Sequence, residues 1–536
     1  MQKSQRETLA TIIDLNGSTR PDTHATCDIC IIGAGAAGLY LAQRLSRHGF
    51  RVIILEAGGA TCGTGASIGI EPIFSASRYR GALDGRAFGW GGSTSRWGGL
   101  LVPHFDLDVR DEVSPEFVAW RHITNVVRER SSLVFATLGL GSRPDFLSFP
   151  EVALGSNAKL LHDCGLEAVA AEFLPFRRRN LTYLASPRMS QNVTVYLNAV
   201  ASKWLVKPST NGSGAVTTVE ASSQEAKSLR VSAKSFVVAA GAIESARILL
   251  EIDRSTGERM FSRCATIGRC LSDHLSCAIA DVHPDDQSQV AKVFGPIFSE
   301  GRMRSFRFIM GTFMKPFLPR HFVHFIFDID NSGFRLVKDL LFSLQRRALP
   351  DLRLPDVIEG LNGLSRLAYN RFVKSRLFIP PRTPVHFQMD IEQTPDPENR
   401  VHLGEKTDRF GRPVAVVHWN VTDTDYKNIR MLSQQLLRRW PDRSLGFPRL
   451  VPIQFGDANL KPYDAYHPVG TCRMGNDEEA TVDLELTVRG TQNLYVLSTG
   501  VFPSAGTANP TFSMLCLGDM LADKLARFHS NAVGLI

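Results

Sequence analysis

The chain has 536 residues, of which 43% are hydrophobic and 21% charged, and its formal net charge is +8. This composition is ordinary for a folded protein with a large core, and it argues against a disordered, collagen-like or disulfide-rich chain. The segment between Asn331 and Pro384 contains ten Lys or Arg residues and four acidic residues. The difference between them accounts for most of the net charge of the chain. Because the remainder is nearly balanced, we expect no nucleic-acid partner.

Neither the N-terminal segment nor the cysteines suggest export. The first twenty residues lack an apolar run of signal-peptide length, and no stretch is apolar and long enough to predict a membrane-spanning helix. We therefore expect a cytoplasmic protein. Cys27 and Cys30 form a CxxC, but they lie in the apolar run CDICIIG, which predicts a buried strand. We interpret this pair as structural rather than as a redox or zinc site.

The first predicted unit, near the N-terminus, consists of a strand, a glycine turn, a helix and a second strand. The glycines have the spacing Gly33-x-Gly35-x-x-Gly38, and the second strand ends at Glu56. The first glycine permits a tight turn, the second lets a pyrophosphate approach the backbone, and the third lets the helix pack closely. The pyrophosphate would lie at a helix N-terminus, and Glu56 is placed to accept a hydrogen bond from a ribose 2′-OH. This pattern predicts a dinucleotide site without separating NAD from FAD.

A second glycine-rich segment, FGWGGSTSRWGG, begins at Phe88. So many glycines predict a close approach of the backbone to something flat or bulky, and Trp90 and Trp97 argue against a simple exposed loop. Further on, the residues after Asn192 predict two short strands. The segment Ser235–Leu250 predicts a strand, a glycine turn and a helix.

Six segments then occur in a fixed order along the chain: GAGAAG, GGSTSRWGG, AAGAIESARILL, IGRCLSDH, HPVGTCRMG and NPT before a final helix. Together they resemble the glucose–methanol–choline (GMC) oxidoreductase family, whose members bind FAD. The resemblance covers nearly the whole chain and is weakest between Asp106 and Arg188. The closing stretch and Glu392–Leu403 are most similar to the bacterial branch that oxidises sugars and polyols.

The resemblance implies a set of residues that contact FAD. They are Gly33, Gly35, Ala36, Ala37, Gly38, Glu56, Ala57, Trp90, Gly91, Gly92, Ser93, Trp97, Gly98, Gly99, Ala201, Ala240, Gly241, Ser498, Asn509, Pro510 and Thr511. Two positions depart from the family. Arg96 stands where some sugar-oxidising relatives bond a histidine covalently to FAD, so we predict non-covalent FAD. Ser498 stands where many members carry an aspartate-containing segment, so this contact is expected to be weaker or different.

The resemblance also implies a catalytic pair. His467 of HPVGTC corresponds to the family's base toward the substrate hydroxyl, and its partner falls on Asn509. Imidazole titrates in the range that such a base needs. The amide of Asn509 can hydrogen-bond the oxygen of the substrate hydroxyl without competing for its proton. Pro510 suits the first turn of a helix whose N-terminus, in the family, stabilises the reduced flavin. We interpret His274 of LSDH as part of a structural and cofactor-contact turn, and we expect no metal.

The predicted reaction is oxidation of a hydroxyl on a sugar, polyol, glycoside or other alcohol to a carbonyl, with hydride transfer to FAD. Oxygen, a quinone or a redox protein would reoxidise the flavin. Two alternatives remain open. One is a lyase with a structural flavin, because the family includes hydroxynitrile lyases. The other is a non-catalytic, membrane-associated flavoprotein.

We expect an α/β fold with a Rossmann-like FAD-binding lobe interleaved with an α+β substrate lobe. The FAD-binding lobe would contain residues 25–105, 190–280 and 455–530, and the substrate lobe residues 106–189 and 281–454. The substrate lobe should be built on an antiparallel sheet, because four of its segments predict strands. These segments are Phe306–Phe313, His321–Ile329, Val385–Glu392 and Val414–Asn420.

The segment 331–380 predicts two amphipathic helices with basic flanks. We favour a lid over the substrate cavity, in which the arginines are solvated. The alternative is peripheral contact with the anionic inner face of a membrane.

Overall fold

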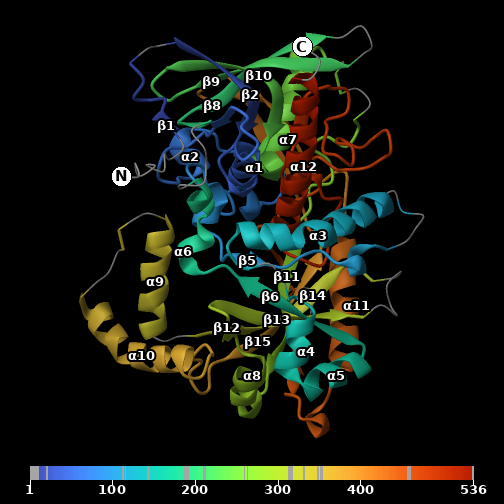
Figure 1. Cartoon of the computed structure of the whole chain (residues 1–536). Helices are drawn as coiled ribbons and strands as arrows, with labels where there is room; N and C mark the ends of the chain where they lie inside the picture. The colour runs from blue at the N-terminus through green and yellow to red at the C-terminus, as the bar shows by residue number, and fades with distance from the viewer. Residues whose placement is uncertain are drawn as a thin grey trace.

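The computed structural model has two lobes, each built on its own β-sheet, one above the other in Figure 1. Segments from the beginning, middle and end of the chain meet in the upper lobe, where blue, green and red ribbons lie together (Figure 1). The described residues run from 11 to 533, without 20–21, 111–113, 115, 142–144, 186–191, 209–212, 259, 262–263, 312–317, 330–331, 347–348, 351–353 and 455–459.

The upper sheet has the strand order β1-β7-β3-β2-β10-β9-β8, with β20 beside β10. Its strands are β1 (Thr11–Asp14), β2 (Asp22–Ile32), β3 (Val52–Leu55), β7 (Val193–Leu197), β8 (Val200–Pro208), β9 (Gly214–Ser222), β10 (Ser228–Val238) and β20 (Leu494–Val496). The strands from β1 to β10 pair in parallel, and β9 and β8 continue the sheet antiparallel. This confirms the predicted Rossmann-like lobe.

The centre of the upper sheet is apolar on both faces. Ile29 and Ile31 of β2 and Ile54 of β3 are fully buried, as continuous apolar runs in parallel strands should be. Burial of each such side chain stabilises the fold by about 1.5–3 kcal/mol. Cys27 and Cys30 also lie buried in β2 without a disulfide, as the structural interpretation of the CxxC predicts.

The lower sheet is antiparallel, with the order β18-β11-β15-β14-β13-β6-β5; in addition, β12 pairs with β13 and β19 with β11. Its strands are β5 (Leu100–Leu101), β6 (Leu166–Phe173), β11 (His274–Val282), β12 (Ile297–Ser299), β13 (Arg302–Met310), β14 (His321–Phe327), β15 (Val385–Glu392), β18 (Leu450–Pro452) and β19 (Tyr463–Asp464). Three of the four strands predicted for an antiparallel sheet are thus β13, β14 and β15.

The fourth predicted strand forms, but it lies in a different sheet. Strand β17 (Pro413–His418) pairs antiparallel with β16 (Arg400–Thr407) and parallel with β4 (Ile73–Phe74). The expectation that it belongs to the large antiparallel sheet was therefore wrong. Its apolar alternation indicates a half-buried strand, and alternation alone does not specify the partner.

Helices cover the sheets and connect them (Figure 1). Their bounds are α1 (Ala36–Ser46), α2 (Gly65–Ile68), α3 (Phe117–Thr137), α4 (Ser148–Leu154), α5 (Ser156–Asp163), α6 (Phe176–Arg179), α7 (Gly241–Ser255), α8 (Gln287–Phe294), α9 (Ser332–Arg346), α10 (Leu354–Phe372), α11 (Asp423–Arg439) and α12 (Pro510–Val533). Helix α12 packs on both α1 and α3, which joins the two lobes. Helices α9 and α10 pack on each other at the left edge of Figure 1. They match the helical layer predicted for 331–380.

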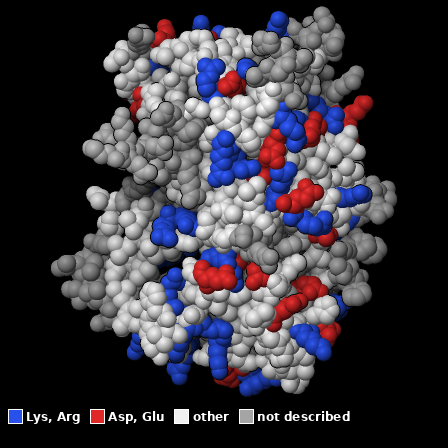
Figure 2. Space-filling model, viewed as in Figure 1, with Lys and Arg blue, Asp and Glu red and all other residues white. Residues whose placement is uncertain are grey.

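One face of the molecule shows mixed charge (Figure 2). Basic and acidic side chains lie interspersed over the described part of the face in Figure 2. Such mixing differs from the continuous basic stripe typical of nucleic-acid-binding proteins. Among the helices in the described part of the chain, none combines the length and the apolar character that crossing a bilayer requires.

Candidate active site

A cavity of about 670 Å³ lies where the glycine turns of the upper lobe meet the segment before α12. Its walls include most of the residues expected from the sequence to contact a dinucleotide. Those that line it are Gly33, Gly35, Ala36, Ala37, Glu56, Ala57, Gly92, Ser93, Trp97, Gly98, Ala201, Ala240, Gly241, Ser498, Asn509, Pro510 and Thr511. His467 lines the same cavity. The structure therefore brings together segments that are separated by more than four hundred residues in the sequence.

Three helices begin at this cavity. Gly35 is the N-cap of α1, Gly241 is the first residue of α7, and Pro510 is the first residue of α12. Each N-terminus presents N–H groups that have no partner within the helix and the positive end of the helix dipole. A Cβ added at Gly35 or Gly241 would meet no atom within 4 Å. The cavity therefore has open space and hydrogen-bond donors where a pyrophosphate needs them.

Four of the expected contact residues do not line the cavity but shape its walls. A Cβ at Gly38 would overlap the carbonyl oxygen of Gly33, so this glycine serves the packing of α1 against its own turn. A Cβ at Gly91 or Gly99 would collide with neighbouring side chains, and Trp90 is buried in the core. Sequence alone does not separate glycines that face a ligand from glycines that face the protein.

Glu56 is buried at the end of β3, and its carboxylate is already hydrogen-bonded. Its Oε2 accepts from the backbone N–H of Ala34 at 2.8 Å, and its Oε1 accepts from those of Gly58 and Gly89 at 3.0 and 2.8 Å. Burial nonetheless raises the pKa of Glu56 above its usual value, and these backbone hydrogen bonds oppose the rise. Glu56 also lines the cavity, where the sequence predicts its contact with a ribose hydroxyl.

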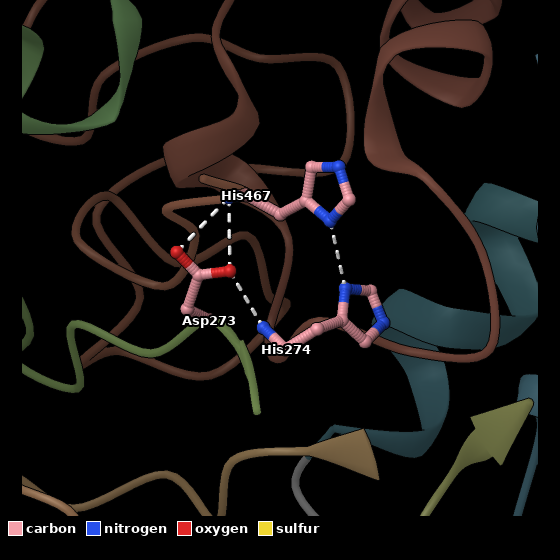
Figure 3. Close-up of side chains that lie close together, drawn as sticks. All are labelled: Asp273, His274 and His467. Atoms are coloured by element: carbon pink, nitrogen blue, oxygen red, sulfur yellow. Dashed lines mark hydrogen bonds between the residues drawn. The ribbon is translucent and has the colours of Figure 1, made fainter. Parts of the chain in front are cut away.

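The loop after β19 is held over the cavity by a buried carboxylate. The backbone N–H of His467 donates to both oxygens of Asp273 at 2.9 Å, and the backbone N–H of His274 donates to one of them at 2.7 Å (Figure 3). The hydroxyl of Tyr79 donates to the same carboxylate. Burial raises the pKa of Asp273 to about 8. Asp273 therefore ties the His467 loop to the start of β11.

The imidazole rings of His274 and His467 point toward each other (Figure 3), and their Nδ1 atoms lie 3.1 Å apart. The Nε2 of His274 is 3.0 Å from the carbonyl oxygen of Gly506, which can only accept, so this nitrogen carries the hydrogen. In the neutral ring its Nδ1 must then accept, and the Nδ1–H of His467 donates to it. The Nε2 of His467 is left with a lone pair, and the Nδ2 of Asn509 donates to it at 2.9 Å.

Both rings are neutral near pH 7. Burial lowers the pKa of His274, and burial together with the nearby His274, Arg307 and His104 lowers the pKa of His467 well below its usual value. The neutral state is the one that the hydrogen-bond chain requires. His467 therefore presents an unprotonated nitrogen at a cavity wall, as a general base does.

Asp273, His274 and His467 also form the kind of group that could hold a metal ion, because one potential ligand atom of each lies within 4.8 Å of the others. All of these atoms already have partners in the protein. The carboxylate accepts two backbone N–H groups and the Tyr79 hydroxyl, and the two rings bond each other. We therefore assign the group to hydrogen bonding and assign no metal to it.

Helix α9 is docked on the second glycine loop. The side-chain Nε2 of Gln345 donates to the carbonyl oxygens of Thr94 and Trp97 at 2.9 Å each, and Gln345 is buried. The next residue, Arg346, lines the cavity. The end of α9 thus forms part of the cavity wall. The sequence indicates a helix near the substrate but gives no sign of this contact.

Several cavity residues are absent from the sequence prediction. Arg86, Glu244 and Arg412 form a buried charged wall, in which Arg412 Nη1 lies 2.9 Å from Glu244. His274 lies outside the catalytic pair in the sequence interpretation, whereas the structure places it against His467. An acid and a histidine directly before an apolar strand, as in Asp273-His274, are a signal that could have indicated a buried polar network.

Comparison with known proteins places this architecture in a family. Two GMC oxidoreductase models match residues 147–276 and 395–518, and an NAD(P)-binding Rossmann-like model matches residues 31–95. The chain is similar to pyridoxine 4-oxidase from Mesorbium loti in structure, with a TM-score of 0.54 over 93% of this chain and 99% of that one at 17% identity. At this identity the likeness shows the fold.

Curated relatives match over shorter segments. The oxygen-dependent choline dehydrogenase of Citrobacter koseri is 41% identical over 152 residues, 26% of this chain and 27% of that protein. The choline oxidase of Arthrobacter globiformis is 34% identical over 96 residues, 17% of this chain and 18% of that protein. These matches thus span about a quarter or less of the relatives. With both GMC models matched and the fold shared, the chain belongs to the GMC oxidoreductase family.

Proposed function

We propose that this protein oxidises the hydroxyl group of an alcohol to a carbonyl, with bound FAD as the hydride acceptor. One observation carries the proposal. The lone pair of His467 Nε2 lies at the wall of the dinucleotide cavity. Beside it lies the amide of Asn509, which can donate a hydrogen bond to the hydroxyl oxygen of a substrate. A neutral base next to a hydride acceptor is what alcohol oxidation requires.

The cavity residues fit FAD. The N-termini of α1 and α7 offer N–H groups to a pyrophosphate, Gly35 leaves room for it, and Glu56 lines the cavity where a ribose hydroxyl would bind. When bound, FAD would supply the hydride acceptor of the reaction. The N-terminus of α12 at Pro510 would stabilise negative charge near the reacting centre.

Two side chains would handle the substrate hydroxyl. His467 Nε2 accepts the hydroxyl proton as the C–H bond breaks, while His274 continues to accept from its Nδ1–H. The Nδ2 of Asn509 donates to the substrate oxygen in place of its present bond to the imidazole. The Oδ1 of Asn509 is buried without a hydrogen-bond partner among the described residues, so it is available to a ligand group.

We propose that FAD is held non-covalently. Arg96 lines the cavity at the position where some relatives carry the covalently bonded histidine, and a guanidinium cannot form that bond. Acid precipitation of the purified holoenzyme should release the yellow cofactor into the supernatant. Retention of the colour in the pellet would contradict non-covalent binding.

We propose alcohols as the substrates. A panel of test alcohols should begin with sugars, polyols and glycosides. Choline and pyridoxine belong in the panel because the names of the relatives and of the structural neighbour point to them. Oxygen, a quinone and a redox protein are the candidate acceptors. The oxygen-dependent relative supports testing oxygen first.

We further propose that α9 and α10 act as a lid rather than as a membrane contact. The two hydrogen bonds of Gln345 hold α9 on the glycine loop, and Arg346 faces the cavity. A helix that lay on a bilayer would need no such contact with the cavity wall. Peripheral contact at the inner face of a membrane is the competing outcome, and sedimentation with anionic vesicles tests it.

Anaerobic titration of the oxidised holoenzyme with the alcohol panel tests the proposed reaction directly. Loss of the oxidised flavin absorbance with at least one alcohol, and formation of one carbonyl per flavin, is the expected result. A lyase with a structural flavin would leave the flavin oxidised while it turned over a cyanohydrin. A flavin that no alcohol reduces would contradict the proposal.

A further inference from the structure

One face of the antiparallel sheet is directed toward the His467 side of the molecule. Phe308 pairs with Val323, Phe322 with Asp390, Asp390 with Ser276, and Glu392 with His274. Because side chains alternate along a strand and paired residues share a face, the register assigns one set of residues to a single face. The set is His274, Ser276, Arg307, Phe322, His324 and Asp390.

Arg307 stands out in this set because it is a buried cation that forms no hydrogen bond or ion pair with the described part of the chain. Its side chain is 8% exposed, and its Nε makes no hydrogen bond to any residue that the structure describes. Asp390, on the same face, attracts Arg307 from beyond contact distance, and its hydrogen bonds are made to other groups. It accepts from the Ser276 hydroxyl, and its Oδ2 lies 3.4 Å from His324 Nδ1. An unpaired buried charge is costly, and proteins compensate it with a partner.

Two other buried arginines, in or next to strands β13 and β14, have such partners. On the opposite face of β13, Arg304 Nε lies 3.0 Å from Glu172. Just before β14, Arg320 Nη1 lies 3.1 Å from Glu392. Arg307 lacks an equivalent carboxylate within contact distance among the described residues. No described carboxylate in contact with Arg307 therefore offsets its charge.

Arg307 is connected to His467 through two rings, those of Phe322 and His274. Its guanidinium carbon lies 5.0 Å from the centroid of Phe322. The same ring meets the imidazole of His274 edge to face, with centroids 5.6 Å apart, and His274 bonds His467. The unpaired cation thus lies on the face of the sheet that carries His274.

We propose that Arg307 binds an anionic group of the substrate, a carboxylate or a phosphate, and so selects acidic alcohols over neutral ones. This inference rests on the proposed alcohol oxidation and narrows its substrate class. A guanidinium pairs with either anion through two parallel hydrogen bonds, and a buried site strengthens them. The anion would supply the negative charge that Arg307 lacks, and Phe322 would keep the guanidinium in place.

The test compares matched alcohols with the wild-type holoenzyme and its variants. The neutral probes are glycerol and glucose. The anionic probes are glycerol 3-phosphate and glucose 6-phosphate for the phosphate arm, and glycerate and gluconate for the carboxylate arm. Anaerobic flavin reduction is measured for each, giving the rate at saturation and the apparent dissociation constant. In parallel, inorganic phosphate and acetate are titrated into the oxidised holoenzyme, with flavin absorbance as a readout that requires no turnover.

Arg307→Met removes the charge and keeps an apolar side chain of similar length, and Arg307→Lys keeps the charge without the paired geometry. Lys292→Met, on the exposed surface of α8, is the control for loss of one positive charge. We expect the wild type to prefer one anionic arm over its neutral partner. Arg307→Met should lower that preference about tenfold or more, as loss of a charge-assisted hydrogen bond implies. Arg307→Lys should retain part of the preference.

The outcomes separate this inference from the proposed function. If neutral alcohols reduce the flavin and the wild type shows no preference for either anion, the selection by Arg307 is refuted while the oxidation stands. An equal loss of rate toward neutral and anionic alcohols in Arg307→Met would also refute it, because the cation would then serve the reaction itself. If Arg307→Met does not fold, the test rests on Arg307→Lys and on the anion titrations. The selection is then refuted if Arg307→Lys keeps the full preference for anionic alcohols and the oxidised holoenzyme binds neither anion. If no alcohol reduces the flavin, both proposals fail.

Discussion

The Nδ1 atoms of His274 and His467 lie 3.1 Å apart, and His274 must be the acceptor because its Nε2–H is committed to the carbonyl of Gly506. This relationship fixes which nitrogen of His467 carries a hydrogen. Without it, the ring could expose either an N–H or a lone pair to the cavity. We therefore infer that His274 positions the proposed base, although it does not itself line the cavity.

Replacing His274 tests this positioning role. In His274→Phe the Nδ1–H of His467 loses its acceptor, which costs about 1–3 kcal/mol for an unsatisfied buried group. We expect the rate of flavin reduction at saturating alcohol to fall about 10- to 100-fold, with the apparent dissociation constant nearly unchanged.

The matched variant is His274→Asn, whose side-chain oxygen can accept from His467. It should recover part of the lost rate, and its pH profile should stay close to that of the wild type. Equal losses in the two variants, or a loss explained by reduced FAD content, would mean that His274 serves only the packing of the fold.

The pH dependence of flavin reduction tests the protonation state of His467. Its pKa lies well below the usual value because of burial and nearby positive charge. The neutral, active form therefore persists as pH falls through 6.5, the ordinary histidine value, and is lost only at lower pH. We expect a rate that is flat between about pH 6 and pH 7.5 and that declines below this range. A half-maximal rate at or above the ordinary value would contradict this assignment.

Two glycines of the first loop should respond differently to alanine. Gly35 has φ −80°, which any residue adopts, and open space around its Cα, so Gly35→Ala should fold with little change in the melting temperature of the apoprotein. Its FAD affinity should fall, because the new methyl group occupies the approach of the pyrophosphate. Gly38→Ala should instead destabilise the apoprotein itself, since its Cβ overlaps the Gly33 carbonyl. Calorimetry of the apoproteins and FAD titration distinguish the two, and full FAD affinity in Gly35→Ala would count against the site.

The lid proposal predicts an effect of Gln345 on substrate binding. Gln345→Ala removes two hydrogen bonds to the glycine loop, together worth about 1–3 kcal/mol. We expect a several-fold higher KM with nearly unchanged kcat. Asn370→Ala on α10 is the control, because the Asn370 side chain donates to the Arg366 carbonyl of its own helix. If Gln345→Ala changes neither constant and the wild type sediments with anionic vesicles, the membrane alternative is favoured.

The sequence predicts the first part of the dinucleotide-binding lobe well, because each element there depends on residues that are close together in the sequence. The strand before Gly33, the helix after it and the strand before Glu56 each follow from apolar periodicity, and the glycine spacing follows from the turn that they share. The helix that starts at Pro510 is predicted for the same reason. These elements need no knowledge of distant partners.

The remainder depends on contacts between distant segments. The bond between His274 and His467 joins residues 193 apart, and nothing in either segment alone specifies it. Strand β17 joins a separate small sheet because register and partner are set by tertiary packing. That Arg307 has no carboxylate in contact within the described part of the chain follows only from the folded sheet, because the register decides which side chains share its face.

The most direct test of the central claim is the anaerobic rate of flavin reduction in His467→Ala. The variant and the wild type are compared at equal FAD content, with the alcohol that reduces the wild type fastest. We predict that His467→Ala retains FAD and loses about 10²- to 10⁴-fold in the rate at saturation, as removal of a general base does. A variant that keeps FAD and reduces it at the wild-type rate would show that His467 is not the base.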